Sequence, residues 1–201
     1  MGDLLSTVLR DAQHRGYLGQ GDIDHFIRHA LGYLEELTPA ADAPGVDLGS
    51  GSGVPGLVLA DALAGTTWHL VERSRARADW LTRAVARLGL IDRVHVRHEA
   101  AETTGRGSLR GTCALVVARC FAGPSVAAEC AAPLLMVGGR AVFSDLHGSL
   151  RWDEVALDEL GLALVATRER AEGAYTILEQ QRGCPERFPR SPGVPARRPL
   201  F

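Results

Sequence analysis

Two common residue types are missing from this sequence, which contains no lysine and no asparagine. All 22 of its basic side chains other than histidine are therefore arginine. Lysine and asparagine both have A-rich codons, so a GC-rich bacterial genome explains their absence without any selection for guanidinium chemistry. An arginine is consequently weak evidence of function unless its position adds to the argument.

Long apolar runs and paired cysteines are also absent. Arg119 and Glu129 interrupt the longest apolar region, so no run reaches the roughly 18 residues that span a bilayer. The first residues lack the basic and apolar regions of a secretory signal, and we expect a cytoplasmic protein without a membrane span. No Cys-x-x-Cys pair occurs, which argues against a zinc site or a disulfide framework and favours free thiols. The four cysteines are Cys113, Cys120, Cys130 and Cys184.

The order of apolar patterns predicts one α/β domain with short additions at both ends. Residues 1–38 carry two amphipathic helical stripes, and the stretch from Thr38 to Gly45 is a linker. Residues 45–181 alternate short β-rich runs with helical ones, which predicts a doubly wound, mostly parallel, Rossmann-like sheet with an antiparallel hairpin at its edge. The expected strands are 46–48, 68–71, 94–96, 114–118, 141–143, 162–167 and 175–179, and the expected helices after residue 45 are 56–64, 74–88, 124–135 and 152–160.

The last segment, residues 182–201, has a different composition. It holds five prolines, a density that predicts no regular helix or strand. It also holds five arginines and a single acidic residue, Glu186. Two interpretations remain open, a solvated tail and a basic strap that binds phosphates. The arginines of this tail are Arg182, Arg187, Arg190, Arg197 and Arg198.

A glycine-rich loop carries the strongest local signal. The expected strand at 46–48 runs directly into Gly49, Gly51 and Gly53, and Pro55 suits the first turn of a following helix. Glycines allow a tight turn and a close approach of the backbone to a ligand. Two ligand classes use such a loop, namely dinucleotides and S-adenosylmethionine.

The residues around the loop favour the second class. Gly51 begins a G-x-G-x-x-G pattern with Glu72 about 20 residues on, as in dinucleotide sites. Asp47, however, begins D-x-G-x-G-x-G, which looks like the S-adenosylmethionine loop of class I methyltransferases. A carboxylate about 4 Å from a pyrophosphate charge costs about 4 kcal/mol at an effective dielectric of about 20, whereas an ammonium or sulfonium is attracted to it. Asp47 could alternatively serve only to cap the helix or brace the loop.

Two further residues lie where ligands bind in open α/β sheets, at the carboxyl ends of strands. Glu72 ends the second strand, where a carboxylate can accept hydrogen bonds from both hydroxyls of a ribose. Arg119 ends the fourth, apolar strand and needs an anion or a polar partner there. The alternative for Glu72 is an acid that merely faces solvent, and the alternative for Arg119 is a structural ion pair.

Several segments together resemble one bacterial family. They are Arg28-His29, the loop from Asp47 to Gly56, Val71-Glu72-Arg73-Ser74, Ala101-Glu102, Ala118-Arg119-Cys120-Phe121-Ala122, and the tail from Arg187 to Leu200. The family methylates guanine N7 in 16S ribosomal RNA and is also called glucose-inhibited division protein B. The resemblance extends over nearly the whole chain.

The resemblance implies a class I methyltransferase fold, an S-adenosylmethionine cofactor and the 16S rRNA of the small ribosomal subunit as substrate. It implies cofactor contacts at the glycine loop, including Asp47, Gly51 and Gly53, with Glu72 on the ribose. Arg119 would contact the cofactor and would also orient the reacting base. We expect a monomer without a metal ion. The other implied cofactor residues are Gly49, Val54, Ala101 and Glu102, and the implied RNA-binding residues are Arg28, His29, Arg187, Arg190, Arg197 and Arg198.

Three positions depart from the family pattern. Gly32 stands where the family has aspartate three residues after its Arg-His pair, Asp145 lies in a segment where a Lys-Gly pair is usual, and Cys120 replaces a commoner alanine. These departures leave two alternatives open. One is a methyltransferase that acts on another RNA or a small molecule, and the other is a non-catalytic RNA- or ribosome-binding protein.

Overall fold

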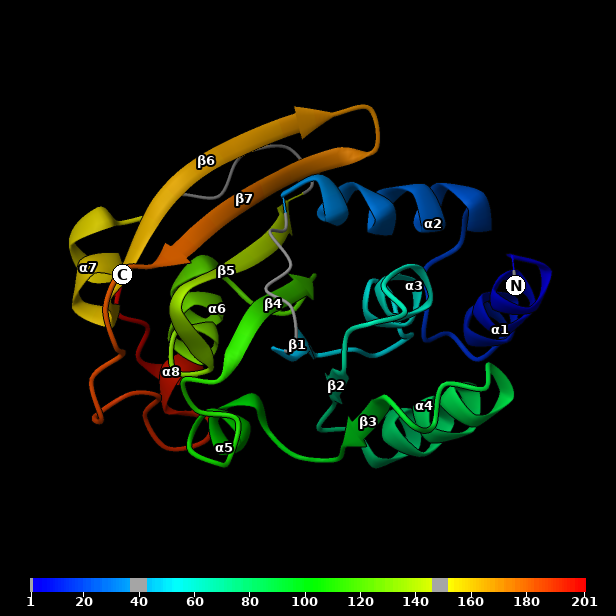
Figure 1. Ribbon diagram of the computed structural model, residues 1–201, viewed down its shortest axis with the longest axis horizontal. Coiled ribbons are helices and arrows are strands. Elements are labelled where there is room, and N and C mark those ends of the chain that lie inside the picture. Colours follow the sequence, from blue (N-terminus) through cyan, green and yellow to red (C-terminus); the bar gives the residue numbers. More distant parts are fainter. Residues whose placement is uncertain (1, 37–42, 146–151) are drawn as a thin grey trace.

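A single mixed sheet organises the chain in the computed structural model, which describes residues 2–36, 43–145 and 152–201 (Figure 1). The strand order is β3-β2-β1-β4-β5-β7-β6. The first five strands of that order pair in parallel, and β7 pairs antiparallel with both β5 and β6. The strands are β1 Gly45–Leu48, β2 Trp68–Val71, β3 Val94–Arg97, β4 Cys113–Arg119, β5 Leu135–Asp145, β6 Leu162–Arg170 and β7 Gly173–Gln180.

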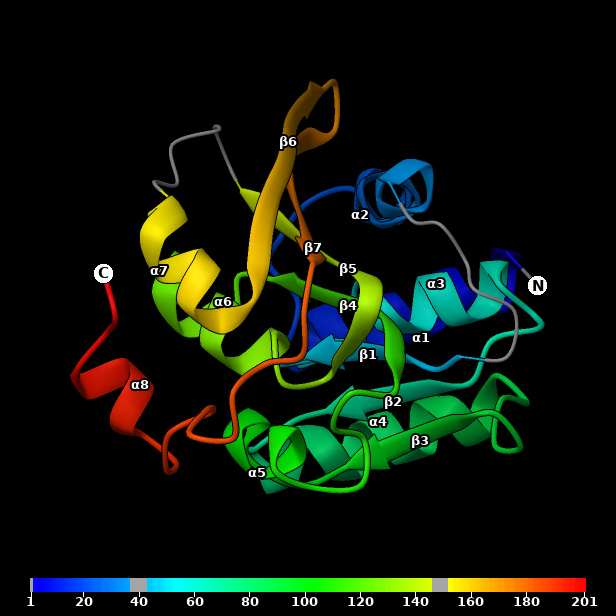
Figure 2. The same cartoon turned by 60° about the vertical axis from the view of Figure 1, so that its left-hand side comes forward.

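Helices cover both faces of this sheet, as two views separated by 60° show (Figures 1 and 2). Helices α1 to α4 cover one face, and α5 to α7 cover the other. The predicted doubly wound sheet with an antiparallel edge hairpin is confirmed. The helices are α1 Gly2–His14, α2 Ile23–Leu31, the 3₁₀ helix η1 Gly32–Glu36, α3 Gly56–Ala62, α4 Arg75–Arg87, α5 Ala101–Gly105, α6 Pro124–Ala131, α7 Glu154–Leu160 and α8 Val194–Arg197.

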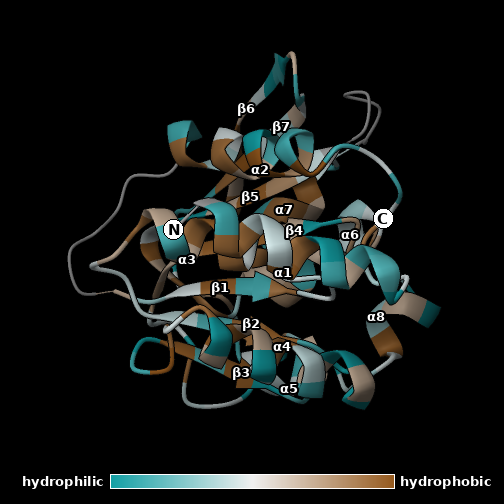
Figure 3. Ribbon diagram, turned by 90° about the vertical axis from the view of Figure 1, so that its right-hand side faces the viewer, coloured by the Kyte–Doolittle hydropathy of each residue, from teal (hydrophilic) through white to brown (hydrophobic). Residues whose placement is uncertain are grey.

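The sheet separates two apolar cores, because successive strand side chains point to opposite faces. On β4, Val117 packs with the helices of the first face, while Val116 and Ala118 pack on the second. Strands β1, β2 and β4 are buried almost throughout, as expected for parallel strands covered on both sides. Coloured by hydropathy, the central strands are mostly hydrophobic, while the tip of the β6–β7 hairpin is hydrophilic (Figure 3). Among the described residues, no helix is long and apolar enough to cross a membrane.

Strand β5 begins earlier than the sequence suggested. The predicted helix 124–135 was too long, because α6 ends at Ala131 and β5 already begins at Leu135. Gly138 and Gly139, which lie between the predicted helix and the predicted strand at 141–143, belong to β5. The register against β4 shifts between Cys113 and Leu115, so a local irregularity accommodates the two glycines without ending the strand.

The second N-terminal stripe forms two elements instead of one helix. Helix α2 ends at Leu31 and continues as the 3₁₀ helix η1. A Cβ atom at Gly32 would lie 2.4 Å from the hydroxyl oxygen of Tyr175, which donates a hydrogen bond to the backbone oxygen of His29. Tyr175 therefore fills the space that a side chain at position 32 would occupy. The predicted linker from Thr38 to Gly45 lies partly outside the described residues, as does the segment Ser144-Asp145-Leu146 that departs from the family pattern.

The tail is folded onto the domain, contrary to the expectation that its prolines exclude helix. Helix α8 has Pro195 in its first turn, a position that needs no backbone N–H donor. Arg110 anchors the approach to α8, because its guanidinium donates to the backbone oxygens of Cys184, Pro185 and Phe188. The Phe188 ring is itself buried.

Candidate cofactor and acceptor site

Several backbone amides of the glycine loop donate hydrogen bonds to acceptors within the protein. The amide of Ser50 donates to the oxygen of Val71, and that of Gly53 donates to the oxygen of Ser50. The amide of Gly51 donates to Oε2 of Glu72 at 3.0 Å. A dinucleotide site needs such amides to hold the pyrophosphate. The amides of Ser50, Gly51 and Gly53 are therefore not available to a pyrophosphate, which weighs against a dinucleotide site.

Asp47 lies buried beneath the loop. Its Oδ2 accepts a hydrogen bond from the amide of Gly56 at 3.0 Å, at the start of α3. The approach needs a glycine, because a Cβ at position 56 would lie 2.5 Å from the same oxygen. Burial raises the pKa of Asp47 to about 7, partly offset by the hydrogen bond from Gly56. Its Oδ1 is buried without a hydrogen-bond partner. The structural alternative for Asp47 is thus present, together with an unused carboxylate oxygen.

A cavity of about 440 Å³ opens beside the loop, and we call it the loop cavity. Glu72 lines it, with Oε2 held by the amide of Gly51 and Oε1 by the amide of Ser74 at 2.7 Å. Two backbone donors thus fix the orientation of the carboxylate of Glu72, a residue that is only 4% exposed. The same cavity is lined by Gly49, Ala101, Glu102 and Phe121, among others.

Gly49 brings the backbone close to this cavity. Its φ of +68° lies in the left-handed region that favours glycine. An added Cβ would lie 2.6 Å from Cδ2 of Phe121. Phe121 was named from the sequence only within the family motif, although an aromatic residue two positions after the end of β4 is a signal that could have found it.

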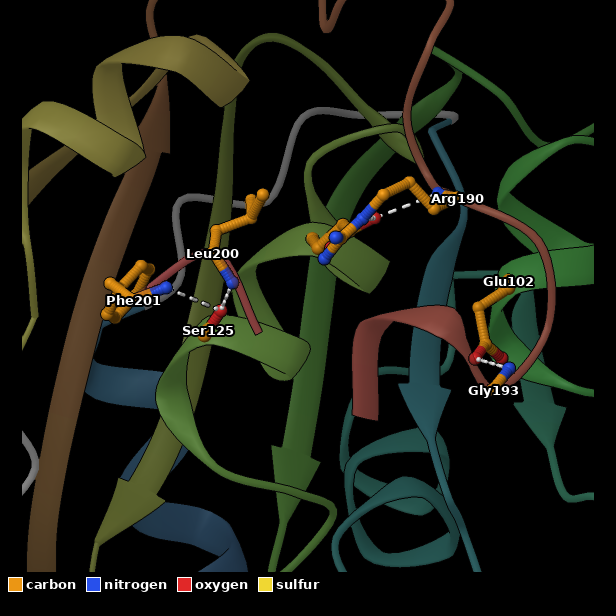
Figure 4. A network of polar contacts seen from close by, with 7 residues as sticks. Glu102, Ser125, Arg190, Gly193, Leu200 and Phe201 are labelled. Carbon is orange, nitrogen blue, oxygen red and sulfur yellow. Dashed lines mark hydrogen bonds and ion pairs between the residues drawn. The ribbon is translucent and has the colours of Figure 1, made fainter. Parts of the chain in front are cut away.

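The C-terminal tail forms part of the wall of the loop cavity, through Pro192, Gly193 and Ala196. Figure 4 shows the side chain of Glu102 directed at Gly193, whose amide donates to Oε1 of Glu102 at 2.9 Å. At the far end of the tail, the hydroxyl of Ser125 accepts hydrogen bonds from the amides of the last two residues (Figure 4). The tail is therefore a structural component of this site.

A buried ion pair holds the middle of the tail. Glu129 on α6 is fully buried and pairs with the guanidinium of Arg190, with the shortest N–O distance at 2.5 Å. The backbone amide of Arg190 also donates to Glu129 at 2.8 Å. Arg190, predicted to bind RNA, thus has an intramolecular partner. A lone carboxylate on an apolar helix was the sequence signal for such a pair.

A second cavity of about 530 Å³ lies on the other side of the β4 end, and we call it the hairpin cavity. It is lined by α2, by the ends of β4 and β5, and by the β6–β7 turn, which lies beside α2 in Figures 1 and 2. Arg119 lines this cavity, not the loop cavity. Its Nε donates to the backbone oxygen of Val54 at 3.3 Å, and its guanidinium lies 5.3 Å from the centre of the Phe26 ring. Among the described residues, Arg119 forms no ion pair.

The other predicted residues divide between the two cavities and the surface. His29 lines the hairpin cavity, while Gly51, Gly53 and Val54 lie in the loop without lining either cavity. Arg28 is exposed on α2. The remaining predicted RNA-binding side chains of the tail, Arg187, Arg197 and Arg198, are exposed.

Two histidines have strongly perturbed pKa values. Burial, with Arg119 and His25 nearby, lowers the pKa of His29 to about 4. Burial and Arg97 lower the pKa of His69 to about 4 as well. Nδ1 of His69 accepts a hydrogen bond from Arg97 at 3.3 Å, away from both cavities. His69 is therefore a structural residue.

Comparison with known structures agrees with this arrangement. A geranyl diphosphate C-methyltransferase from Streptomyces coelicolor A3(2) is 15% identical, with a TM-score of 0.59 over 76% of this chain and 75% of that one. A 16S rRNA methyltransferase of T. thermophilus, in complex with AdoMet and guanosine, is 22% identical with a TM-score of 0.51, over 78% of this chain and 39% of that one. These similarities show the class I methyltransferase fold.

Comparison of sequences gives the family. The ribosomal RNA small subunit methyltransferase G of Synechococcus sp. (strain CC9902) is 33% identical over 98% of this chain and 88% of its own length. That of Rubrobacter xylanophilus is 36% identical over 89% of this chain and 72% of its own length. The family model described as rRNA small subunit methyltransferase G matches residues 6–169. The chain belongs to the rRNA small subunit methyltransferase G family.

Proposed function

We propose that this protein transfers a methyl group from S-adenosylmethionine to guanine N7 in the 16S rRNA of the small ribosomal subunit. The observation that carries the choice of cofactor is the loop itself. The amides of Ser50, Gly51 and Gly53 are occupied by acceptors within the protein, and the buried carboxylate of Asp47 beneath the loop would repel a pyrophosphate. Family membership supports the substrate.

The residues of the loop cavity fit this cofactor. The carboxylate of Glu72 is held rigidly by two amides and retains lone pairs for the two ribose hydroxyls. Ala101 and Glu102 would meet the adenine edge, and Phe121 offers an apolar wall. Gly49, Gly51, Gly53 and Val54 would shape the path of the methionine moiety, with the unpaired Oδ1 of Asp47 supplying negative potential.

The chemistry needs positioning more than proton transfer. When bound, the sulfonium donor would supply an electrophilic methyl carbon to the N7 lone pair, and the electron pair of the broken C–S bond would stay on sulfur. No proton moves, so no general base is required. Arg119 would orient the base from the hairpin cavity, and such alignment of reactants can lower a barrier by about 7–11 kcal/mol.

The RNA backbone would contact exposed arginines on two sides of the site. Arg28 lies on α2, and Arg187, Arg197 and Arg198 lie on the tail. Arg190 would act by holding the tail in place through Glu129. We propose that the protein acts as a cytoplasmic monomer without a metal ion; the described residues hold no cluster of metal-ligand side chains.

Methyl transfer to isolated small ribosomal subunits tests this proposal. The expected result is one labelled guanine, mapped by chemical cleavage and primer extension. Arg119→Ala should abolish transfer while the protein keeps its circular dichroism spectrum and its calorimetric affinity for S-adenosylhomocysteine. Cofactor binding without RNA labelling would favour a different substrate, and no heat at millimolar cofactor would leave only a non-catalytic binding protein.

A further inference from the structure

We propose that the hairpin cavity is the site of the acceptor guanine, with Phe26 as a stacking surface and with Arg119 and Glu172 recognising opposite edges of the base. This inference rests on the proposed function and assigns it a second binding site. The loop cavity would hold the methyl donor, and the hairpin cavity would hold the base that receives the methyl group.

The backbone at the end of β4 connects the two cavities. Arg119 lines only the hairpin cavity, Phe121 lines only the loop cavity, and Cys120 between them lines both. Cys120 has a φ of 52°, the only positive φ of a non-glycine residue among the described residues. Such backbone conformations concentrate at functional sites. This turn sends consecutive side chains into different cavities, which places donor and acceptor on either side of one residue.

The size and one wall of the hairpin cavity suit a purine. About 530 Å³ lies within the usual range of small-molecule sites. Phe26 is partly exposed at this wall, and the guanidinium of Arg119 lies over its ring at 5.3 Å. Proteins that recognise an unstacked RNA base commonly stack it on aromatic rings or on arginine guanidinium planes.

The charges of the cavity distinguish guanine from adenine. Guanine has an acceptor, O6, beside N7 and has donors at N1 and N2. The guanidinium of Arg119 offers only donors, which suit O6, and the carboxylate of Glu172 only accepts, which suits N1–H and the N2 amino group. Adenine has a donor beside N7 and an acceptor at N1, so it would face the wrong group at both edges.

Glu172 is available for this role. It lies at the β6–β7 turn and is partly buried on the cavity wall, yet its side chain forms no ion pair or hydrogen bond within the described part of the chain. The nearby Arg170 is engaged elsewhere, in ion pairs with Glu35 and Glu36 of η1. Both Glu172 and Arg119 act electrostatically on His29, so the imidazole lies within range of both charges.

Methyl transfer by two cavity variants tests the inference. In Glu172→Gln, a neutral amide replaces the carboxylate, and in Phe26→Leu, an aliphatic side chain replaces the ring. We expect each to lower kcat/KM for small subunits by about tenfold or more, while the affinity for S-adenosylhomocysteine stays within about twofold of wild type. The matched control is Glu154→Gln, which removes the same charge from an exposed residue of α7 outside both cavities.

Failure of this inference differs from failure of the proposed function. If wild type methylates small subunits and both cavity variants do so at wild-type rates, the guanine site is overturned and the proposed function stands. If wild type labels no RNA, the proposed function fails. The cavity is then tested by saturation-transfer NMR with guanosine and adenosine monophosphates on the S-adenosylhomocysteine complex. A guanosine preference that Glu172→Gln abolishes supports the site, and equal binding of both nucleotides refutes it.

Discussion

The ion pair between Glu129 and Arg190 allows a sharp prediction about how the tail is held. Glu129 is fully buried, whereas the Arg190 side chain is 26% exposed. Removing the arginine leaves a buried carboxylate without its counter-charge, which costs about 3–5 kcal/mol. Removing the carboxylate instead leaves an arginine that can turn toward water. We expect Arg190→Gln to destabilise the protein far more than Glu129→Gln does.

The magnitude for Glu129→Gln follows from the contacts that remain. The glutamine oxygen can still accept from the backbone amide of residue 190, which lies 2.8 Å from the carboxylate in the wild type. The loss is then that of charge-assisted hydrogen bonds to a partly exposed guanidinium, about 1–2 kcal/mol. In the double variant Glu129→Gln/Arg190→Gln, the buried charge is absent, so its stability should resemble that of Glu129→Gln alone.

Urea unfolding of the two single variants and the double variant gives the change in unfolding free energy for each. The double-mutant cycle then gives the coupling energy between Glu129 and Arg190. Hydrogen exchange of residues 185–198 shows whether the cost appears as local opening of the tail, because water could reach Glu129 once the tail detaches. Opening would also weaken the affinity for S-adenosylhomocysteine, since Gly193 forms part of the loop cavity. Equal stability of the two single variants, with unchanged exchange in the tail, would refute the reasoning.

Three further substitutions test individual positions. Gly49→Ala must adopt a strained φ and moves Phe121, so calorimetry should show at least about a tenfold loss of cofactor affinity; unchanged affinity would exclude a close approach of the backbone there. Gly32→Ala should lower the free energy of unfolding by about 1–3 kcal/mol through overpacking against Tyr175, and Tyr175→Leu in the same chain should relieve that clash. The pKa of His69 is about 4 in the folded protein and near 6.5 in the unfolded chain. The contribution of its neutral imidazole to stability is therefore complete above pH 6.5 and is lost as the pH falls toward 4. The urea midpoints of wild type and His69→Gln should accordingly lie closer together at pH 5 than at pH 7.

The sheet and the loop were predictable because they depend on local patterns. Parallel strands that are buried on both faces appear in the sequence as short apolar runs. A strand followed by closely spaced glycines is likewise a local pattern and can be recognised without knowing which ligand binds there. The predicted boundary between α6 and β5 was wrong for a physical reason. Gly138 and Gly139 look like a turn locally, but β5 pairs with β4 on either side of them, at Leu135 and at Arg140, so the strand continues through them.

The tail could not be predicted because its partners lie far away in the sequence. Arg190 pairs with a residue 61 positions earlier, and Gly193 with one 91 positions earlier. Composition alone showed that the tail is basic and rich in proline, which left two interpretations equally open, a solvated tail and a basic strap that binds phosphates. The structure adds a third role, because the same segment carries a buried ion pair, one wall of the loop cavity and exposed arginines.

These three features of the tail have a common physical basis. Proline-rich chain loses less conformational entropy when it becomes ordered, so a few contacts suffice to dock it. Glu129 and Glu102 supply those contacts from one side of the tail, through Arg190 and Gly193. The exposed guanidiniums of Arg197 and Arg198 then stay free for anions on the other side. A segment docked this way brings positive charge for the RNA backbone close to the loop cavity, while its own contribution to the cavity wall, Pro192, Gly193 and Ala196, is uncharged.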